Sequence, residues 1–145
     1  MIRILFICHG NICRSTMAQS IFTHLVSQAG VSGMFEIDSA ATATEEIGNP
    51  MYPPAVATLQ HHEIPCVPHL ARRVTRGDYQ HFDHLVLMDH NSLRNLHRII
   101  PEDPQHKVRF LLPRDVADPW QTGDFEITYR DLAEGCSALL ERCLE

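Results

Sequence analysis

The stretch "RILFICHGNICRSTMAQSIFTHLVSQAG", residues Arg3 to Gly30, decides the fold. Its first part, Arg3 to Cys8, is short and nearly all apolar, as expected of a strand that is buried on both faces of a sheet. Apolar residues then recur at helical spacing from Met17 to Val26, and Gly30 is a natural helix end. The stretch therefore predicts a strand, a connecting loop and a helix that packs back onto the sheet.

The rest of the chain continues this alternation. Three further runs are typical of strands and three of helices, with irregular segments at 65–77 and 113–123; the strands are expected at 34–40, 82–89 and 107–112, and the helices at 53–64, 90–100 and from 124 onward. Strands that alternate with helices pair in parallel through right-handed crossovers. We therefore predict an α/β fold, a doubly wound sandwich with a four-stranded parallel sheet flanked by helices.

Length and composition narrow the protein class. A chain of 145 residues with 44% hydrophobic residues predicts a single domain over residues 1–145. The net charge of −6, without a basic block, argues against a nucleic-acid partner. No apolar run is long enough for a signal peptide or a membrane span, and five cysteines without a disulfide pattern favour a reducing, cytoplasmic location. The oligomeric state stays open.

The loop from Cys8 to Ser15 joins the first strand to the first helix. Ligands of parallel α/β sheets bind at this edge, where the unpaired N–H groups and the dipole of a helix N-terminus favour an anion. Five residues separate Cys8 from Arg14, enough for the backbone to curl around one tetrahedral oxyanion, and Gly10 and Asn11 tolerate unusual dihedrals. We therefore predict an anion-binding loop after the first strand, formed by Cys8, His9, Gly10, Asn11, Ile12, Cys13 and Arg14.

Cys8 is the candidate nucleophile of this loop. Helix N-terminal N–H groups and a nearby arginine stabilise a thiolate, which would be placed for in-line attack on phosphorus. The planar guanidinium of Arg14 would grip two phosphate oxygens, and Ser15 would donate its hydroxyl to the thiolate while capping the helix. The alternative is an inert core cysteine beside a turn. The spacing of Cys, Arg and Ser at the anion-binding point of the fold favours the nucleophile.

A phenolate or alkoxide leaving group needs a proton, so a carboxylic acid is expected opposite Cys8. Two Asp-Pro pairs are candidates. Asp103 precedes the fourth strand and so lies at the amino edge of the sheet, whereas Asp118 follows that strand and shares the carboxyl edge with Cys8. This geometry selects Asp118 as general acid, with Asp115 as the local alternative. Asp89, also near this edge, is expected to support the anion-binding loop.

The stretch "FICHGNICRSTMAQ" resembles the Cys-x5-Arg-Ser signature of the low-molecular-weight protein tyrosine phosphatases. The resemblance extends over essentially the whole chain, through "IDSAATATEEIGNP", "HLARRVT", "FDHLVLMD" and "DPW". It implies a cysteinyl-phosphate mechanism without metal or other cofactor, a phosphotyrosine-containing protein as substrate and inorganic phosphate as product. It also implies that Asp118 protonates the leaving group and then activates water. Thr16 departs from the proline that commonly follows the serine.

The resemblance further implies supporting and substrate-binding residues. Asn11 would hold a strained backbone conformation, fixed by Ser39 after the second strand and by His69 from the long loop. Trp120 would flank the substrate ring, and its apolar wall together with the depth of the cleft would select phosphotyrosine over phosphoserine. Glu45 stands where the family often has an aromatic residue, which would make the cleft more acidic and weaken the binding of acidic phosphopeptides.

Two further groups of residues invite a chemical role. Cys13 is either a buried filler or the partner that traps an oxidised Cys8 as a reversible disulfide, and the redox role is favoured. Ten histidines raise the possibility of a metal site, but pairs such as His81 and His84 lack a carboxylate or thiolate at ligand spacing, so no metal is expected and surface histidines are the better interpretation.

Three alternative functions remain. A thiol-dependent arsenate reductase of this fold needs relay cysteines after the third strand, and residues 88–100 contain none. A protein-arginine phosphatase has threonine where Ile12 stands, and the bulkier Ile12 is expected to exclude a phosphoguanidinium group. A catalytically silent phosphoprotein-binding module has no need of the acid Asp118.

Overall fold

The computed structural model describes all residues, 1–145, and contains a four-stranded sheet. The strands are β1 (Ile2–Cys8), β2 (Phe35–Ala41), β3 (His84–Leu87) and β4 (Val108–Phe110). Every neighbouring pair is parallel, in the order β2-β1-β3-β4. The predicted parallel sheet is therefore confirmed, with β1 at its centre.

Six α-helices connect and flank these strands: α1 (Arg14–Gln28), α2 (Pro53–His61), α3 (Arg76–His81), α4 (His90–Leu96), α5 (Pro119–Thr122) and α6 (Phe125–Cys143), with a short 3-10 helix, η1, at Ser32–Met34. The sequence predicted α1, α2, α4 and α6. It missed α3 and α5, because helices of 6 and 4 residues are too short to show a period. None of the helices combines the length and the apolar character that crossing a membrane requires.

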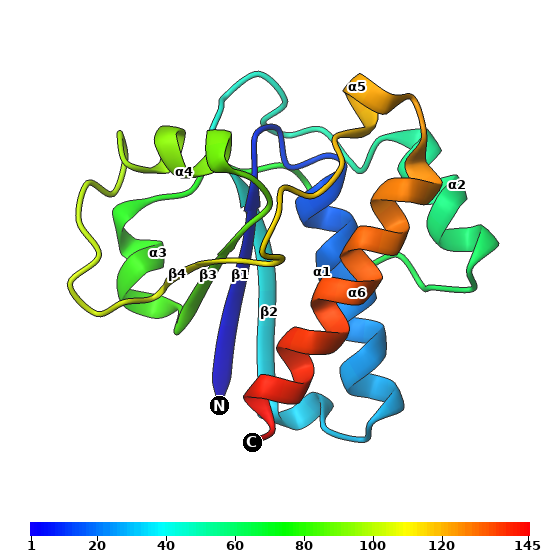
Figure 1. Cartoon of the computed structure of the whole chain (residues 1–145), viewed down its shortest axis with the longest axis horizontal. Helices are drawn as coiled ribbons and strands as arrows, with labels where there is room; N and C mark the ends of the chain where they lie inside the picture. The colour runs from blue at the N-terminus through cyan, green and yellow to red at the C-terminus, as the bar shows by residue number, and fades with distance from the viewer.

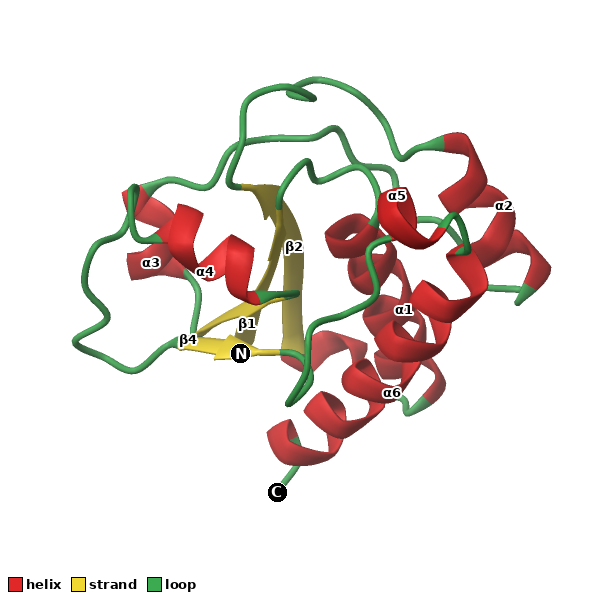
Figure 2. Ribbon diagram, turned by 45° about the horizontal axis from the view of Figure 1, so that its top comes forward, coloured by secondary structure: helices red, strands yellow, loops and turns green.

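The helices form a layer on each face of the sheet (Figures 1 and 2). Successive side chains of β1 point to opposite faces of the sheet, and each face is apolar and needs a covering layer. Ile4 and Phe6 pack with α1, α2 and α6, whereas Leu5 and Ile7 pack with residues of α3 and α4. All four side chains are fully buried, so the nearly continuous apolar run of β1 reflects its central position.

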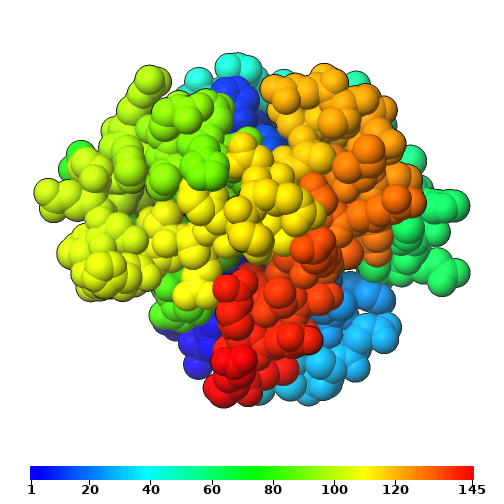
Figure 3. Space-filling view, in the orientation of Figure 1, coloured from blue at the N-terminus to red at the C-terminus, as the bar shows by residue number.

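The carboxyl ends of the strands meet on the side of the sheet where α4 and α5 begin (Figure 1). In the space-filling view, the blue N-terminal segment that follows β1 is visible in a hollow between the segments of α4 and α5 (Figure 3). Asp103 lies at the other end of β4, where its carboxylate accepts hydrogen bonds from the backbone N–H groups of Lys107 and Val108. The fold thus separates the two Asp-Pro pairs as predicted.

Gly135 of α6 lies against Leu111, and Gly135→Ala is expected to destabilise the protein. An added Cβ would lie 2.4 Å from Leu111 Cγ, a side chain that is itself buried. We expect the clash to lower the free energy of unfolding by about 1–3 kcal/mol. This loss is expected even though alanine is more favourable than glycine inside a helix by about 1 kcal/mol. Urea unfolding measures this. Gly33→Ala is the control, because nothing lies within 4 Å of its added Cβ; equal effects of the two changes would contradict the prediction.

Candidate active site

The loop between β1 and α1 presents free backbone donors. The carbonyls of Cys8, His9 and Ile12 accept hydrogen bonds from the N–H groups of Thr42, Ala43 and Tyr52, which fixes the course of the loop. By contrast, the N–H groups of residues 9, 10 and 12–16 donate no hydrogen bond within the chain. These unpaired donors at the start of a helix suit a tetrahedral oxyanion.

The helix start differs from the prediction in one respect. Helix α1 begins at Arg14 with Cys13 as its N-cap, and no side chain caps it. The expected capping by Ser15 is therefore wrong, because Ser15 lies inside the first turn and its hydroxyl is used elsewhere. The predicted contact with the thiol is present, with Ser15 Oγ 2.9 Å from Cys8 Sγ.

A hydrogen-bonded series fixes the direction of that contact. The backbone N–H of Arg72 donates to Asn11 Oδ1, so the amide NH₂ of Asn11 faces the other way and donates to Ser15 Oγ at 2.8 Å. Because Ser15 Oγ accepts this bond, its proton is free to point at Cys8 Sγ. The backbone N–H of Asn11 also donates to Cys8 Sγ, at 3.3 Å. Two donors are thus directed at the sulfur of Cys8.

Of the two loop residues that tolerate unusual dihedrals, Asn11 adopts a left-handed backbone conformation with φ of 62°, and Gly10 does not. His69 Nε2 lies 2.7 Å from Asn11 Oδ1 and 3.2 Å from Ser39 Oγ, so the imidazole N–H donates to Asn11. Ser39 lies within β2 instead of after it, and its hydroxyl donates to Gln19 Oε1 at 2.6 Å. Burial lowers the pKa of His69, although the carboxylate of Asp38, 3.5 Å from Nδ1, opposes this shift. His69 thus contacts Asn11 directly, whereas Ser39 contacts His69 and Gln19 and not Asn11.

Arg14 is buried and lies between two carboxylates. Its Nη1 donates to Asp89 Oδ2 at 2.8 Å and to the carbonyl of Val116 at 3.2 Å, while Nη2 lies 3.9 Å from Asp118 Oδ2. Burial opposes a charged guanidinium, but the negative charges of Cys8 and Asp89 outweigh it and raise the pKa of Arg14. Burial likewise opposes ionisation of Asp89, but the charge of Arg14 together with hydrogen bonds from Ser92 and Arg14 outweighs it and lowers the pKa of that carboxyl. The contact with Asp89 thus fixes the orientation of the Arg14 guanidinium.

Asp118 lies on the same cleft as Cys8, as the carboxyl-edge rule predicted. It is the N-cap of α5, where Oδ1 accepts a hydrogen bond from the backbone N–H of Trp120 at 3.0 Å and Oδ2 is directed toward Arg14. Asp115, the alternative acid, does not line the cleft; its Oδ1 accepts hydrogen bonds from the N–H and the imidazole of His90. The geometry therefore favours Asp118.

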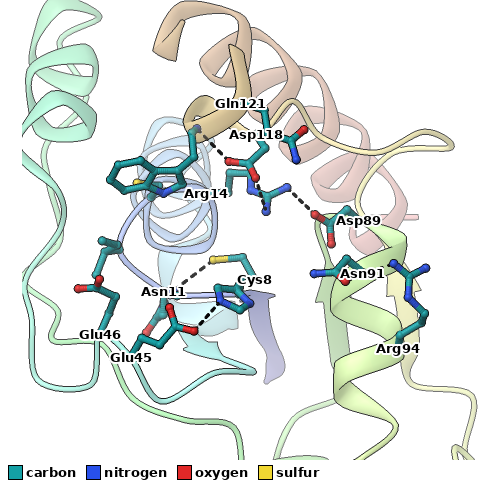
Figure 4. Close-up of a pocket in the computed structure, with 15 residues that line it drawn as sticks. Cys8, Asn11, Arg14, Glu45, Glu46, Asp89, Asn91, Arg94, Asp118 and Gln121 are labelled. Atoms are coloured by element: carbon teal, nitrogen blue, oxygen red, sulfur yellow. Dashed lines mark hydrogen bonds and ion pairs between the residues drawn. The ribbon is translucent and has the colours of Figure 1, made fainter. Parts of the chain in front are cut away.

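The cleft itself has a volume of about 660 Å³ (Figure 4). Its lining is mostly polar and comes from the loop after β1, the segment after β2, α4 and α5. The lining residues are Cys8, His9, Gly10, Asn11, Ile12, Cys13, Arg14, Glu45, Glu46, Asp89, Asn91, Arg94, Asp118, Trp120 and Gln121. All residues of the predicted anion-binding loop line this one cleft.

The three predicted rim residues also line the cleft, with different exposure. Trp120 is 60% exposed, and its ring packs on Tyr52 with centroids 4.7 Å apart. Glu45 is strongly exposed, and its carboxylate lies 3.4 Å from His9 Nε2. Ile12 is only 6% exposed, so it forms part of the wall and not of the outer rim. The indole therefore offers the large apolar surface at the cleft mouth.

Cys13 lines the cleft but is buried, and its side chain packs with Ile12 and Ala71. Burial, together with the charge of Cys8, raises the pKa of the Cys13 thiol to about 12. Cys13 is therefore a neutral thiol in the wall of this cleft. The remaining cysteines, Cys66, Cys136 and Cys143, do not line the cleft.

Several residues of the cleft were not anticipated from the sequence. Asn91 and Arg94 of α4 and Gln121 of α5 line it, and Glu46 joins Glu45. The position of α4 directly after the carboxyl end of β3 was an available signal, because the same rule selected Asp118. The contact of Arg14 with the carbonyl of Val116 could not be predicted from the sequence, because every residue type has a backbone carbonyl oxygen.

The histidines do not cluster as metal ligands. No group of three or more His, Cys, Asp or Glu side chains is placed to hold a metal ion. The view of them as surface residues is wrong for His62, which stacks on Tyr129 with ring centroids 3.8 Å apart and pairs with Glu126. That histidine joins α2 to α6 and has a packing role.

Comparison with known proteins agrees with this geometry. The family model described as low molecular weight phosphotyrosine protein phosphatase matches residues 3–145. The chain is 38% identical to a protein of that name from Gallus gallus, over 96% of this chain and 94% of the relative, and 35% identical to the low molecular weight protein-tyrosine-phosphatase YfkJ of Bacillus subtilis, over 97% and 94%.

Solved structures agree as well. The crystal structure of YfkJ superposes with a TM-score of 0.93 at 34% identity, covering 98% of this chain and 94% of that one. The low molecular weight protein tyrosine phosphatase of Streptococcus pyogenes superposes with a TM-score of 0.91 at 33% identity, covering 98% and 93%. With its anion-binding loop, buried arginine and facing aspartate, the chain belongs to the low molecular weight phosphotyrosine protein phosphatase family.

Proposed function

We propose that this protein hydrolyses phosphotyrosine in protein substrates, and small aryl phosphates, in two steps at the cleft around Cys8. In the first step the Cys8 thiolate attacks phosphorus in line, an S–P bond forms and the P–O bond to the tyrosine breaks. Asp118 donates a proton to the leaving phenolate. The free backbone N–H groups and Arg14 bind the phosphate oxygens, whose charge they stabilise in the transition state.

In the second step the cysteinyl phosphate is hydrolysed. Asp118, now a carboxylate, takes a proton from a water molecule, whose oxygen attacks phosphorus as the S–P bond breaks. Inorganic phosphate leaves, and Cys8 returns as a thiolate. The contacts from Ser15 Oγ and from the Asn11 N–H stabilise the sulfur as leaving group in this step. We also propose that residues 1–145 act as one domain, in the reducing cytoplasm.

The observation that carries this proposal is the placement of Arg14. Its guanidinium contacts Asp89 at 2.8 Å, approaches Asp118 to 3.9 Å and lies in the same cleft as Cys8. A buried cation is thereby held between the nucleophile and the acid, where a phosphate binds. The exposed ring of Trp120 at the mouth favours an aryl ester, and Cys8 at the bottom of the loop favours a long phosphorylated side chain.

The test measures the rate at which the purified protein turns over phosphotyrosine, phosphoserine, phosphoarginine and arsenate. We expect turnover of phosphotyrosine alone, without added metal and unaffected by a chelator. Turnover of phosphoarginine would indicate a protein-arginine phosphatase, the alternative against which Ile12 argues. Reduction of arsenate would indicate an arsenate reductase and would require a relay thiol beyond Cys13. Binding of phosphotyrosine without hydrolysis would identify a silent binding module and would overturn the proposal.

Arg14→Lys is expected to lower kcat/KM for phosphotyrosine by about 10²–10³-fold. A lysine ammonium is a point charge, so it cannot donate to Asp89 and to two phosphate oxygens in the planar arrangement that a guanidinium allows. Steady-state kinetics measure the loss. Arg130→Lys, the same change at an exposed position of α6 outside the cleft, is the control. Near-normal activity of Arg14→Lys would remove Arg14 from the proposed mechanism.

Cys13→Ser is expected to abolish recovery from oxidation. Peroxide converts the Cys8 thiolate to a sulfenic acid, and the Cys13 thiol then displaces water to form a disulfide that dithiothreitol reduces. Without Cys13, further peroxide oxidises Cys8 irreversibly to a sulfinic acid. The measurement is the fraction of activity recovered after peroxide and then dithiothreitol, with Cys143→Ser as control. Equal recovery in both variants would leave Cys13 as a buried filler.

A further inference from the structure

The mouth of the cleft carries charged side chains that the proposed chemistry does not use. Glu45 and Glu46, from the segment after β2, lie on one side of Cys8, and Asn91 and Arg94 of α4 lie on the other (Figure 4). The two walls therefore differ in the sign of their charge. Asp89 and Asp118 do not alter this contrast, because both are directed toward Arg14.

Arg94 is the positive side of this arrangement. It is exposed, and it is three residues from Asn91, so both side chains lie on the same face of α4. Its Nη2 donates to Asn91 Oδ1 at 3.2 Å, and it has no carboxylate partner. The exposed Arg114, in contrast, pairs with both Asp131 and Glu134. Arg94 thus keeps an unpaired charge at the edge of the active site.

Glu45 and Glu46 form the negative side. Glu46 Oε2 accepts a hydrogen bond from Asn49 Nδ2 at 2.7 Å, which holds the carboxylate in place without neutralising it. Glu45 approaches only His9, whose charge offsets it when the imidazole is protonated. Neither glutamate pairs with an arginine or a lysine. The negative wall therefore keeps a net charge, as the positive wall does.

We propose that this cleft selects phosphotyrosine peptides with flanks of opposite charge, an acidic residue lying at Arg94 and a basic residue lying at Glu45 and Glu46. This inference rests on the proposed function and names its substrate class. The cleft has a volume of about 660 Å³, which is large enough for a ligand bigger than an aryl phosphate. The residues that flank the phosphotyrosine therefore have room inside the cleft. Arg94 and the two glutamates are thus specificity-determining residues, and Cys8, Arg14 and Asp118 act on any aryl phosphate.

The test uses five phosphotyrosine peptides of equal length: acidic–basic, basic–acidic, all acidic, all basic and alanine flanks. A peptide is expected to bind with its chain running in one direction between the two charged walls. One of the two opposite-charge peptides is therefore expected to have the highest kcat/KM of the five. Exposed charge pairs predict an advantage of about two- to fivefold per flank at low salt, which decreases as added salt screens the charges. Phenyl phosphate is measured beside them, and failure to hydrolyse it would contradict the proposed function and not this inference.

Charge-reversal variants then assign each flank. In Arg94→Glu the preference for the acidic flank over alanine is expected to reverse, and in the double variant Glu45→Gln, Glu46→Gln the preference for the basic flank is expected to vanish. Each preference is a ratio of two peptides within one variant, so a change in overall activity does not affect it. Arg98→Glu, the same charge change outside the cleft, is the control. Unchanged ratios in Arg94→Glu, or an equal change in Arg98→Glu, would overturn the inference.

Discussion

Cys8→Ser is expected to reduce phosphotyrosine hydrolysis by on the order of 10⁴-fold or more, the scale of losses when a covalent nucleophile is removed. A serine hydroxyl at this position stays protonated, and neither the Ser15 hydroxyl nor the Asn11 N–H makes it a nucleophile comparable to a thiolate. The loss is expected in kcat for good and poor leaving groups alike, because no S–P bond forms with any substrate. Stopped-assay kinetics with phosphotyrosine and with 4-nitrophenyl phosphate measure it.

Binding separates this loss from misfolding. The free N–H groups of residues 9, 10 and 12–16 and the guanidinium of Arg14 remain in Cys8→Ser, so calorimetry is expected to show that inorganic phosphate still binds. Cys66→Ser, at a half-buried position that does not line the cleft, is the control for the chemical change itself. Substantial activity of Cys8→Ser would refute the cysteinyl-phosphate mechanism.

Asp118→Asn is expected to lower kcat for phosphotyrosine by about 10²–10⁴-fold, the usual contribution of general acid–base catalysis. The effect depends on the leaving group: a phenolate of high basicity needs the proton, whereas 4-nitrophenolate leaves with little help. Formation of the cysteinyl phosphate from 4-nitrophenyl phosphate should therefore be slowed far less. Burst kinetics, which separate the first step from the second, measure this difference.

Asp115→Asn provides the matched control, since Asp115 lies in the same segment but contacts His90 outside the cleft. It is expected to leave turnover of phosphotyrosine close to that of the unmodified protein. If Asp118→Asn slowed the first step equally for both leaving groups, Asp118 would orient Arg14 and would not act as the acid. If Asp115→Asn showed the stronger dependence on the leaving group, the two assignments would be exchanged.

The sequence was sufficient for the parts of the site that are local in the chain. Cys8, Arg14 and Ser15 lie close together in the sequence, so their spacing alone indicates the chemistry. Asp118 was found through topology, because parallel strands bring their carboxyl ends to one edge of the sheet. The same rule applied to the start of α4 would have found Asn91 and Arg94.

Other parts depend on contacts that residue types do not announce. His69 reaches Asn11 across 58 residues of sequence, and only the family resemblance indicated it. The chain shows a histidine in an irregular segment, which is typical of a surface loop, whereas the side chain is buried. Helix α3 carries a capping box of Thr75 and Asp78, a signal that was available despite the short helix. Helix α5 has only an Asp-Pro start, which is equally typical of a turn.

Because of the unpaired N–H groups of the anion-binding loop, the stability of the folded protein is expected to depend on the oxyanions in the solution. An oxyanion that binds these donors binds the folded chain and not the unfolded one, so it shifts the folding equilibrium by mass action. At a phosphate concentration of one hundred times the dissociation constant, unfolding would require about 2.7 kcal/mol more free energy. Under the proposed function, the reaction product would also be a stabilising ligand, and the protein would melt at a higher temperature in phosphate buffer than in a buffer without an oxyanion.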